Sequence, residues 1–298
     1  MCGIVGLYLK NKTLNSQLGK LFSPMLLQMG DRGPDSSGIA VYRDENNGSN
    51  KITLYSSEKS FQWEKFLKLL NNNFLEKSSI KVVSSHAILN TNLETDIFRE
   101  WLNNNFVDLR VMSTGNSLEI YKEIGMPEEV IEQFNLQEMN GSHMIGHTRM
   151  ATESAVTTEG AHPFNTGQDL CLVHNGSLSN HHELRRWLSK EKGISFQTEN
   201  DSEVAAGYLS YQLREGFSLE ESLKSAIKDL DGFYTFAIGT KNGFAVLRDP
   251  IACKPAVLAE CNDWVAMGSE FRALSKLPNI ENADVWEPEP GKIYSWGN

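Results

Sequence analysis

The chain has 298 residues, of which 40% are hydrophobic and 22% charged, so it can bury a hydrophobic core in one large domain or two small ones. Asp and Glu outnumber Lys and Arg by 38 to 28, and the net charge of −10 argues against nucleic acid or an anionic membrane as the main partner. No apolar run reaches the roughly 20 residues that span a bilayer, and the start of the chain lacks the features of a signal peptide. We therefore expect a cytoplasmic protein.

The first elements are predicted to be a strand, a helix and two further strands. Gly3–Leu9 is typical of a buried strand, and apolar residues then recur near the helical period of 3.6 at Leu14, Leu18, Leu21, Met25 and Leu26. The turn-forming residues 31–35 end this helix. Residues 37–43 favour a strand, and residues 51–56, after an Asn-Asn-Gly turn, favour its hairpin partner.

The next stretch, about residues 59–140, differs in character. It predicts a helix around 61–70, a strand at 80–83, a helix at 94–103, a strand at 107–112 and a short helix from Pro127. None of the chemical motifs described below falls in it. We expect residues 2–298 to form one domain, with 59–140 as an α+β segment inserted within it.

Short strands return from His143 onward. They are expected at 143–147, 170–174, 233–239, 243–248, 256–259 and 264–267. Helices are expected to begin near Asn180, near Ser202 and at Ser218; the first and the third have Glu three residues on, the capping-box spacing. Runs of strands separated by helices predict the α+β class, with helices outside layers of sheet.

The cysteines single out one candidate nucleophile. Cys171, Cys253 and Cys261 are too scattered for a disulfide framework or a zinc site. Cys2 differs, because removal of Met1 would leave a thiol and a free α-amine on one residue, and the amine can act as base for the thiol. Many proteins begin with Met-Cys by chance, so this hypothesis needs support further along the chain.

That support is an ordered set of motifs. Downstream of Cys2-Gly3-Ile4-Val5-Gly6 come Arg32-Gly33-Pro34-Asp35, Gly146-His147-Thr148-Arg149, His162-Pro163-Phe164, His174-Asn175-Gly176, Asn200-Asp201-Ser202-Glu203, Asp231-Gly232-Phe233, Arg248-Asp249-Pro250 and Ser269-Glu270. The set resembles the class II glutamine amidotransferases, which are N-terminal-nucleophile hydrolases. The resemblance covers nearly the whole chain outside the inserted segment. It implies a four-layer αββα sandwich.

The resemblance also implies catalytic roles. Cys2 would be the nucleophile, while the Asn175 side-chain amide and the Gly176 backbone N–H would form the oxyanion hole. Taken alone, Asn175-Gly176 is equally typical of a hairpin turn. Four histidines, at 143, 147, 162 and 174, lack the spacing of a metal site, so we predict that no metal is bound.

A glutamine site needs a cation for the α-carboxylate and an anion for the α-ammonium. Arg149 suits the carboxylate, because its forked guanidinium can bind it through two hydrogen bonds; the alternative is a surface salt bridge. Asp201 suits the ammonium; the alternative is a helix N-cap, a place that Ser202 can also fill. Thr152 is expected to line the pocket.

Other residues are expected to complete the site. Arg32, Gly33 and Asp35 would form a supporting wall, with Gly33 allowing a close backbone approach. The loop 150–164 is expected to close over bound glutamine. Met150 and Glu153 depart from the family, since some relatives carry Trp and His at these positions.

The use of the ammonia is the most open question. The sequence has no P-loop, no Ser-Gly-Gly nucleotide loop and no phosphoribosyl-pyrophosphate loop, and the motifs leave no room for a synthase domain. The chain most resembles the separate amidotransferase subunit of glutamate synthase and N-methylglutamate synthase-like complexes. We expect it to hydrolyse L-glutamine through a Cys2 thioester, to hold no cofactor itself, and to supply ammonia to a partner chain that carries FMN. The alternatives are a stand-alone γ-glutamyl amide hydrolase, an amidophosphoribosyltransferase-like protein and a non-catalytic glutamine-sensing module.

Overall fold

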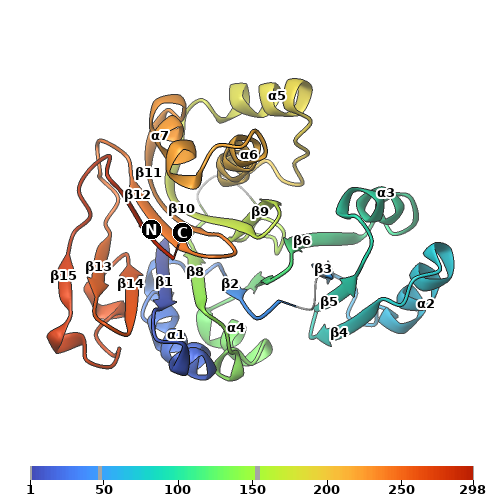
Figure 1. The fold of residues 1–298 in the computed structure, drawn as a ribbon, viewed down its shortest axis with the longest axis horizontal. Helices are drawn as coiled ribbons and strands as arrows, with labels where there is room; N and C mark the ends of the chain where they lie inside the picture. The colour runs from blue at the N-terminus through green and yellow to red at the C-terminus, as the bar shows by residue number, and fades with distance from the viewer. Residues whose placement is uncertain (1, 46–48, 152–154, 298) are drawn as a thin grey trace.

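Two antiparallel sheets stack at the centre of the protein (Figure 1). The computed structural model describes residues 2–45, 49–151 and 155–297. The larger sheet has the order β15-β13-β14-β1-β8-β2-β7, and the smaller has the order β16-β12-β11-β10-β9. The bounds in the larger sheet are β1 Gly3–Leu9, β2 Ser36–Tyr42, β7 Leu118–Ile124, β8 His143–Arg149, β13 Val257–Glu260, β14 Trp264–Gly268 and β15 Asp284–Trp286. Those in the smaller sheet are β9 Phe164–Gly167, β10 Leu170–Leu178, β11 Gly232–Gly239, β12 Phe244–Arg248 and β16 Ile293–Trp296.

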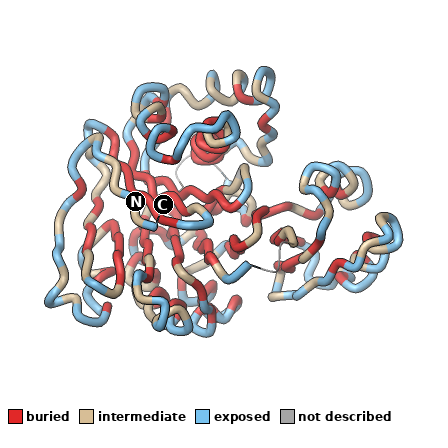
Figure 2. The backbone as a smooth tube through the Cα atoms, in the orientation of Figure 1, coloured by how far each residue is buried: buried red, intermediate tan, exposed pale blue. Residues whose placement is uncertain are grey.

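The alternation of side chains along β1 explains its central place. Ile4 faces the core between the two sheets, whereas Val5 and Leu7 face the core on the other side of the larger sheet. All three side chains are fully buried, which requires a layer on both faces of the strand. Buried residues are concentrated in the strands of the two stacked sheets (Figure 2). β1 therefore runs through the middle of the sandwich, with Cys2 immediately before it.

Helices cover the outer faces of both sheets. α1 (Leu18–Leu27) and α4 (Pro127–Gln133) pack on the larger sheet, and α5 (His181–Lys192), α6 (Asp201–Arg214) and α7 (Leu219–Asp229) cover the smaller one (Figure 1). Short 3₁₀ segments occur at Lys12–Gln17, Gly30–Arg32, Leu136–Glu138, Phe271–Ala273 and Ile280–Asn282. The predicted α+β class and four-layer order are confirmed. In the described part of the chain, no helix has both the length and the apolar character that crossing a bilayer requires.

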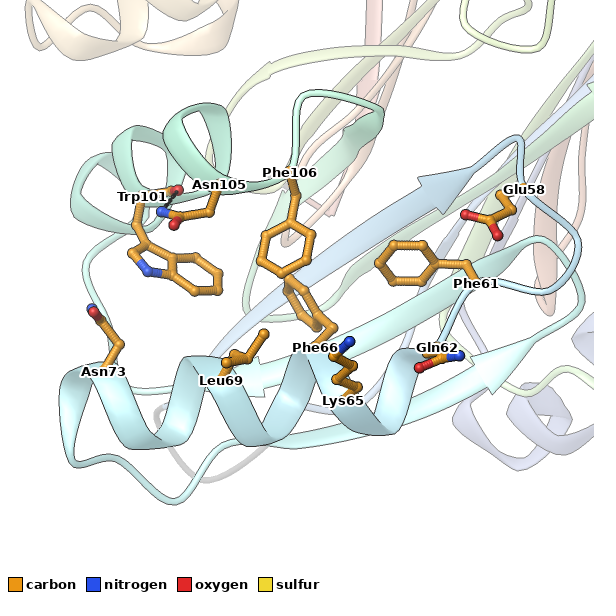
Figure 3. A pocket seen from close by; sticks show the side chains of 10 residues that line it. All are labelled: Glu58, Phe61, Gln62, Lys65, Phe66, Leu69, Asn73, Trp101, Asn105 and Phe106. Carbon is orange, nitrogen blue, oxygen red and sulfur yellow. Dashed lines mark hydrogen bonds between the residues drawn. The ribbon is translucent and has the colours of Figure 1, made fainter.

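A third, four-stranded sheet stands to one side with its own core. It has the order β4-β5-β3-β6, with bounds β3 Asn50–Ser56, β4 Ser79–Val83, β5 His86–Thr91 and β6 Leu109–Gly115, and carries α2 (Trp63–Phe74) and α3 (Thr95–Asn105). The aromatic side chains of Phe61, Phe66, Trp101 and Phe106 line a cleft of about 510 Å³ on it (Figure 3). Strand β7 and helix α4, later in the same stretch of sequence, belong to the larger sheet layer. That residues 59–140 are an insertion stays a prediction.

Two local predictions are wrong. Residues 51–56 do not form a hairpin with 37–43: β3 pairs with β5 and β6, whereas β2 pairs with β7 and β8. The hydrophobic pattern of a strand does not reveal which sheet it joins, and the Asn-Asn-Gly turn lies outside the described residues. The Asn180 side chain does not cap α5; it instead bonds the backbone of Asp229 and Asp231 at the end of α7. The capping box at Ser218 and Glu221 is present.

Candidate active site

The candidate nucleophile Cys2 lies at one end of the sandwich, where β1 begins and β8 ends. The register pairs Gly3 with Thr148, so the antiparallel neighbour strand brings Arg149 beside Cys2. The Cys2 thiol is half-buried and lies 3.8 Å from the Met150 carbonyl oxygen. Its backbone carbonyl accepts hydrogen bonds from Arg32 Nε (3.0 Å) and Asn175 Nδ2 (3.2 Å). Three segments distant in sequence therefore meet at this residue.

Arg149 is a buried cation in an acidic environment. Burial lowers the pKa of Arg149, while Cys2, Asp35 and Asp201 nearby favour its charged form. Its Nη1 atom donates to the Ala155 carbonyl oxygen at 3.2 Å. Arg149 therefore does not form the surface salt bridge that was the alternative, because its guanidinium is held inside the protein, close to the Cys2 thiol.

Asp35 and Gly33 tie the turn before β2 to the end of β8. The Asp35 amide donates to the Arg149 carbonyl oxygen (3.0 Å), and its carboxylate accepts from the Ala151 amide (2.7 Å). A Cβ atom on Gly33 would lie 2.4 Å from the Thr148 carbonyl carbon, so only glycine allows this approach. Both residues support the strand end that carries Arg149.

Arg32 connects Cys2 to the C-terminal part of the chain. The Arg32 side chain is buried, bonds the Cys2 carbonyl through Nε and forms an ion pair with Glu270 through Nη1. The role of Glu270 was not predicted, although Ser269-Glu270 was recognised as a motif. The partner of Ser269 was missed as well: its hydroxyl accepts from the Ile4 amide at 2.9 Å. The sequence feature that could have indicated both roles is the polar pair Ser269-Glu270, which directly follows a buried strand.

Asn175 and Gly176 lie within β10 and are paired with β11, so they do not form the tip of a hairpin. The buried Asn175 side chain donates to the Cys2 carbonyl. An amide nitrogen carries two hydrogens, and this bond uses one of them. Gly176 has φ of 151°, and a Cβ there would lie 2.0 Å from the Phe233 carbonyl oxygen, which explains the glycine.

Asp201 is the first residue of α6, and the helix cap is a neighbouring residue. The Asn200 side chain accepts from the Ser202 amide (2.9 Å), so Asn200 is the N-cap, not Asp201 or Ser202. The sequence offered three adjacent capping residue types, and their order alone does not select one. Asp201 Oδ2 instead accepts from the Leu178 amide at 2.9 Å. The carboxylate is thereby fixed while part of it remains exposed.

Three buried histidines and Ser202 form a hydrogen-bonded cluster beneath these residues. The Ser202 hydroxyl lies 2.8 Å from His162 Nε2 and 2.9 Å from His174 Nδ1, and His147 Nε2 donates to the His174 carbonyl oxygen at 3.1 Å. Burial lowers the pKa of all three rings, that of His147 to about 3, so they are neutral at pH 7. Sequence patterns did not indicate that these histidines meet or that Ser202 joins them.

Two predictions concern other parts of the site. Thr152 and Glu153 lie outside the described residues, so the role of Thr152 stays a prediction. His143 is remote from the cluster: its ring stacks on Tyr42 and its Nε2 donates to the Thr240 carbonyl. Among the residues that the structure describes, no group of three or more His, Cys, Asp or Glu is arranged to hold a metal ion.

Comparisons with known proteins identify the family. Residues 147–276 match the model of the glutamine amidotransferase domain. The chain is 52% identical to the glutamine amidotransferase-like protein GlxB of Rhizobium meliloti, over 99% of this chain and 98% of that protein. It is 32% identical to the amidophosphoribosyltransferase of Methanocaldococcus jannaschii, over 61% of this chain and 40% of that enzyme.

Solved structures share the fold. The glutamine phosphoribosylpyrophosphate amidotransferase of Bacillus subtilis superimposes with a TM-score of 0.62 at 22% identity, covering 99% of this chain and 47% of that one. Together with the sequence match over nearly the full length of GlxB, this similarity assigns both family and fold. The chain belongs to the class II glutamine amidotransferases, whose domain has the N-terminal-nucleophile hydrolase fold.

Proposed function

We propose that this protein hydrolyses L-glutamine to glutamate through a Cys2 thioester and delivers the ammonia to a separate glutamate-synthase-like chain. One observation carries the hydrolytic part: Cys2, Arg149, Asn175 and Asp201 gather at one end of the sandwich. A cation, an anion, a thiol and an amide donor are the groups that acyl transfer from an amino-acid amide requires.

The proposed substrate position follows from the two charged groups. The glutamine carboxylate binds the Arg149 guanidinium, and the ammonium binds the exposed part of the Asp201 carboxylate. These two contacts direct the side-chain amide toward the Cys2 sulfur. The buried Arg149 is well suited to this role, because a guanidinium removed from water binds a carboxylate more strongly than one on the surface.

The proposed reaction has two steps. After Met1 is removed, the free α-amine of Cys2 takes the thiol proton, and the thiolate attacks the amide carbon. The second hydrogen of Asn175 Nδ2 and the Gly176 N–H hold the oxyanion. The carbon–nitrogen bond then breaks as the α-ammonium returns the proton to the leaving ammonia, and water hydrolyses the γ-glutamyl thioester.

The proposal of a separate acceptor chain is supported by how much of each relative is matched. The chain matches 98% of GlxB but 40% of the Methanocaldococcus jannaschii amidophosphoribosyltransferase, so the rest of that larger enzyme has no counterpart in the alignment. We propose that the ammonia is used by a synthase on another polypeptide, one that carries FMN. Affinity purification from native cells should then recover a second chain with flavin absorbance, and that chain should raise glutamine hydrolysis. Equal hydrolysis with and without it would favour a stand-alone hydrolase.

The hydrolytic proposal has a direct test. Purified protein is incubated with L-glutamine, and glutamate and ammonia are both measured for the wild type and for Cys2→Ala. We expect equal amounts of the two products from the wild type and none from the variant. Cys261→Ala is the matched control, because Cys261 is also a half-buried thiol but lies between β13 and β14. Activity that survives Cys2→Ala would refute Cys2 as the nucleophile.

A further inference from the structure

Residues 155–163 form a segment that runs from the Arg149 end of the proposed glutamine site to its Asp201 end. The segment leads into β9. At one end, the Ala155 carbonyl accepts from Arg149 Nη1 at 3.2 Å. At the other, His162 Nε2 is hydrogen-bonded to the Ser202 hydroxyl (2.8 Å), and that hydroxyl donates to Asp201 Oδ1 at 3.3 Å. The segment thus contacts Arg149 directly and reaches Asp201 through Ser202.

A buried lysine on β7 holds the middle of this segment. Lys122 is 3% exposed, and its Nζ donates to the carbonyl oxygens of Glu159 (2.9 Å), Ala161 (2.8 Å) and Pro163 (3.3 Å). Three acceptors match the three hydrogens of an ammonium group. Nearby Glu203 and Glu159 favour its charged form, but no ion pair is found at Nζ among the described residues, and its hydrogen-bond partners are backbone carbonyls.

The surroundings of Lys122 are shaped for this contact. Its Nζ lies 4.7 Å from the centre of the Phe164 ring. Gly38 is its cross-strand partner on β2, and a Cβ there would lie 2.2 Å from the His162 carbonyl oxygen. Burial lowers the pKa of Lys122 to about 8, so holding the charge here costs free energy. A cation kept at such a cost indicates that the carbonyls it gathers need to be fixed.

The next residue on β7 provides a second anchor. One oxygen of the Glu123 carboxylate accepts from the Thr158 hydroxyl, and the other accepts from the Ser85 hydroxyl at 3.1 Å. Ser85 lies between β4 and β5 of the side sheet. The segment is thus attached to the larger sheet through Lys122 and to the side sheet through Glu123.

We infer that Lys122 is a positioning residue for glutamine binding, which fixes residues 155–163 so that Arg149 and Asp201 are held at the spacing of the substrate's carboxylate and ammonium. This role rests on the proposed function. Lys122 touches neither the substrate nor Cys2 in this account. Its loss should therefore weaken glutamine binding while leaving the chemistry on bound glutamine largely unchanged.

The first test does not depend on activity. Amide hydrogen exchange is measured over residues 155–163 in the full-length wild type, in Lys122→Met and in the control Lys51→Met. Lys51 is equally buried, but its Nζ pairs with the Glu119 carboxylate instead of with the carbonyls of the segment. We expect exchange in the segment to rise about tenfold or more in Lys122→Met and to stay unchanged in the control. Unchanged exchange in Lys122→Met would overturn the inference.

The second test separates binding from chemistry. In Lys122→Met we expect KM for glutamine to rise about tenfold or more, with kcat within about threefold of the wild type. If Lys122→Met fails to fold, Glu123→Ala removes the second anchor of the segment instead. In that variant the faster amide exchange and the higher KM should both appear, but be smaller. A wild type that does not hydrolyse glutamine would refute the proposed function but leave the exchange result standing. A wild type that hydrolyses glutamine, with KM unchanged in folded Lys122→Met, would refute the inference alone.

Discussion

Acid should destabilise this protein through its buried histidines. Burial lowers the pKa of His86 and His147 to about 3 and that of His143 to about 4. In the unfolded chain these rings titrate near pH 6.5. Between pH 6.5 and their folded values the unfolded state binds more protons, so the free energy of unfolding must fall as pH falls through this window.

The expected decrease in the free energy of unfolding is large. Each such ring lowers the free energy of unfolding by about 1.4 kcal/mol for every pH unit below 6.5. At pH 5 this amounts to about 2 kcal/mol. The three rings together cost about 6 kcal/mol there, comparable with the whole stability of a typical domain, about 5–15 kcal/mol. We therefore expect unfolding to set in near pH 5.

Urea unfolding at pH 7, 6 and 5 measures this effect. In His143→Gln, which removes one of the buried rings, the slope of the free energy of unfolding against pH should become shallower by up to about 1.4 kcal/mol per pH unit. His182→Asn is the control, because His182 is exposed on α5 and its loss should leave the slope unchanged. A free energy of unfolding that is constant from pH 7 to pH 5 would refute the assignment of these rings as neutral and buried.

Three further predictions concern the site itself. Arg149→Lys should raise KM for glutamine about tenfold to a hundredfold, since a point charge replaces the fork; an unchanged KM in steady-state assays would exclude Arg149 as the carboxylate ligand. Asn175→Ala should lower kcat about 10²–10³-fold, the usual loss for an oxyanion donor, and an unchanged kcat would remove it from that role. Gly33→Ala should lower the free energy of unfolding by about 1–3 kcal/mol, whereas Gly30→Ala, where a Cβ meets no atom nearer than 3.5 Å, should be tolerated in the same urea titration.

Sequence patterns predicted the fold well where periodicity decides it. Gly3–Leu9, α1 and the capping box at Ser218 followed from local spacing, because hydrophobic period and cap chemistry are local properties. The strands β5, β7, β9, β15 and β16 were missed. β7 mixes polar residues with apolar ones and includes Lys122, whose burial depends on carbonyls some 40 residues further along the chain.

In the candidate site, too, some residues could be predicted from the sequence and others could not. Cys2, Arg149, Asn175 and Asp201 were singled out by ordered motifs, and the fold brings them together. Glu270 was given no role, and Ser202 only that of a possible helix cap, because their importance lies in contacts with Arg32 and with the buried His162 and His174, which are distant in sequence. A single sequence carries no record of such pairs, so three-dimensional structure was needed to find them.

The central claim is that Cys2 becomes an N-terminal nucleophile in a site that binds glutamine. The most direct measurement is the intact mass of the purified protein, before and after treatment with a diazo-ketone analogue of glutamine, with L-glutamine as competitor. We predict a protein that lacks Met1 and gains one adduct on Cys2, and that glutamine slows this labelling. A protein that keeps Met1 and gains no adduct would contradict the account, because the amine and the thiol would then never act together.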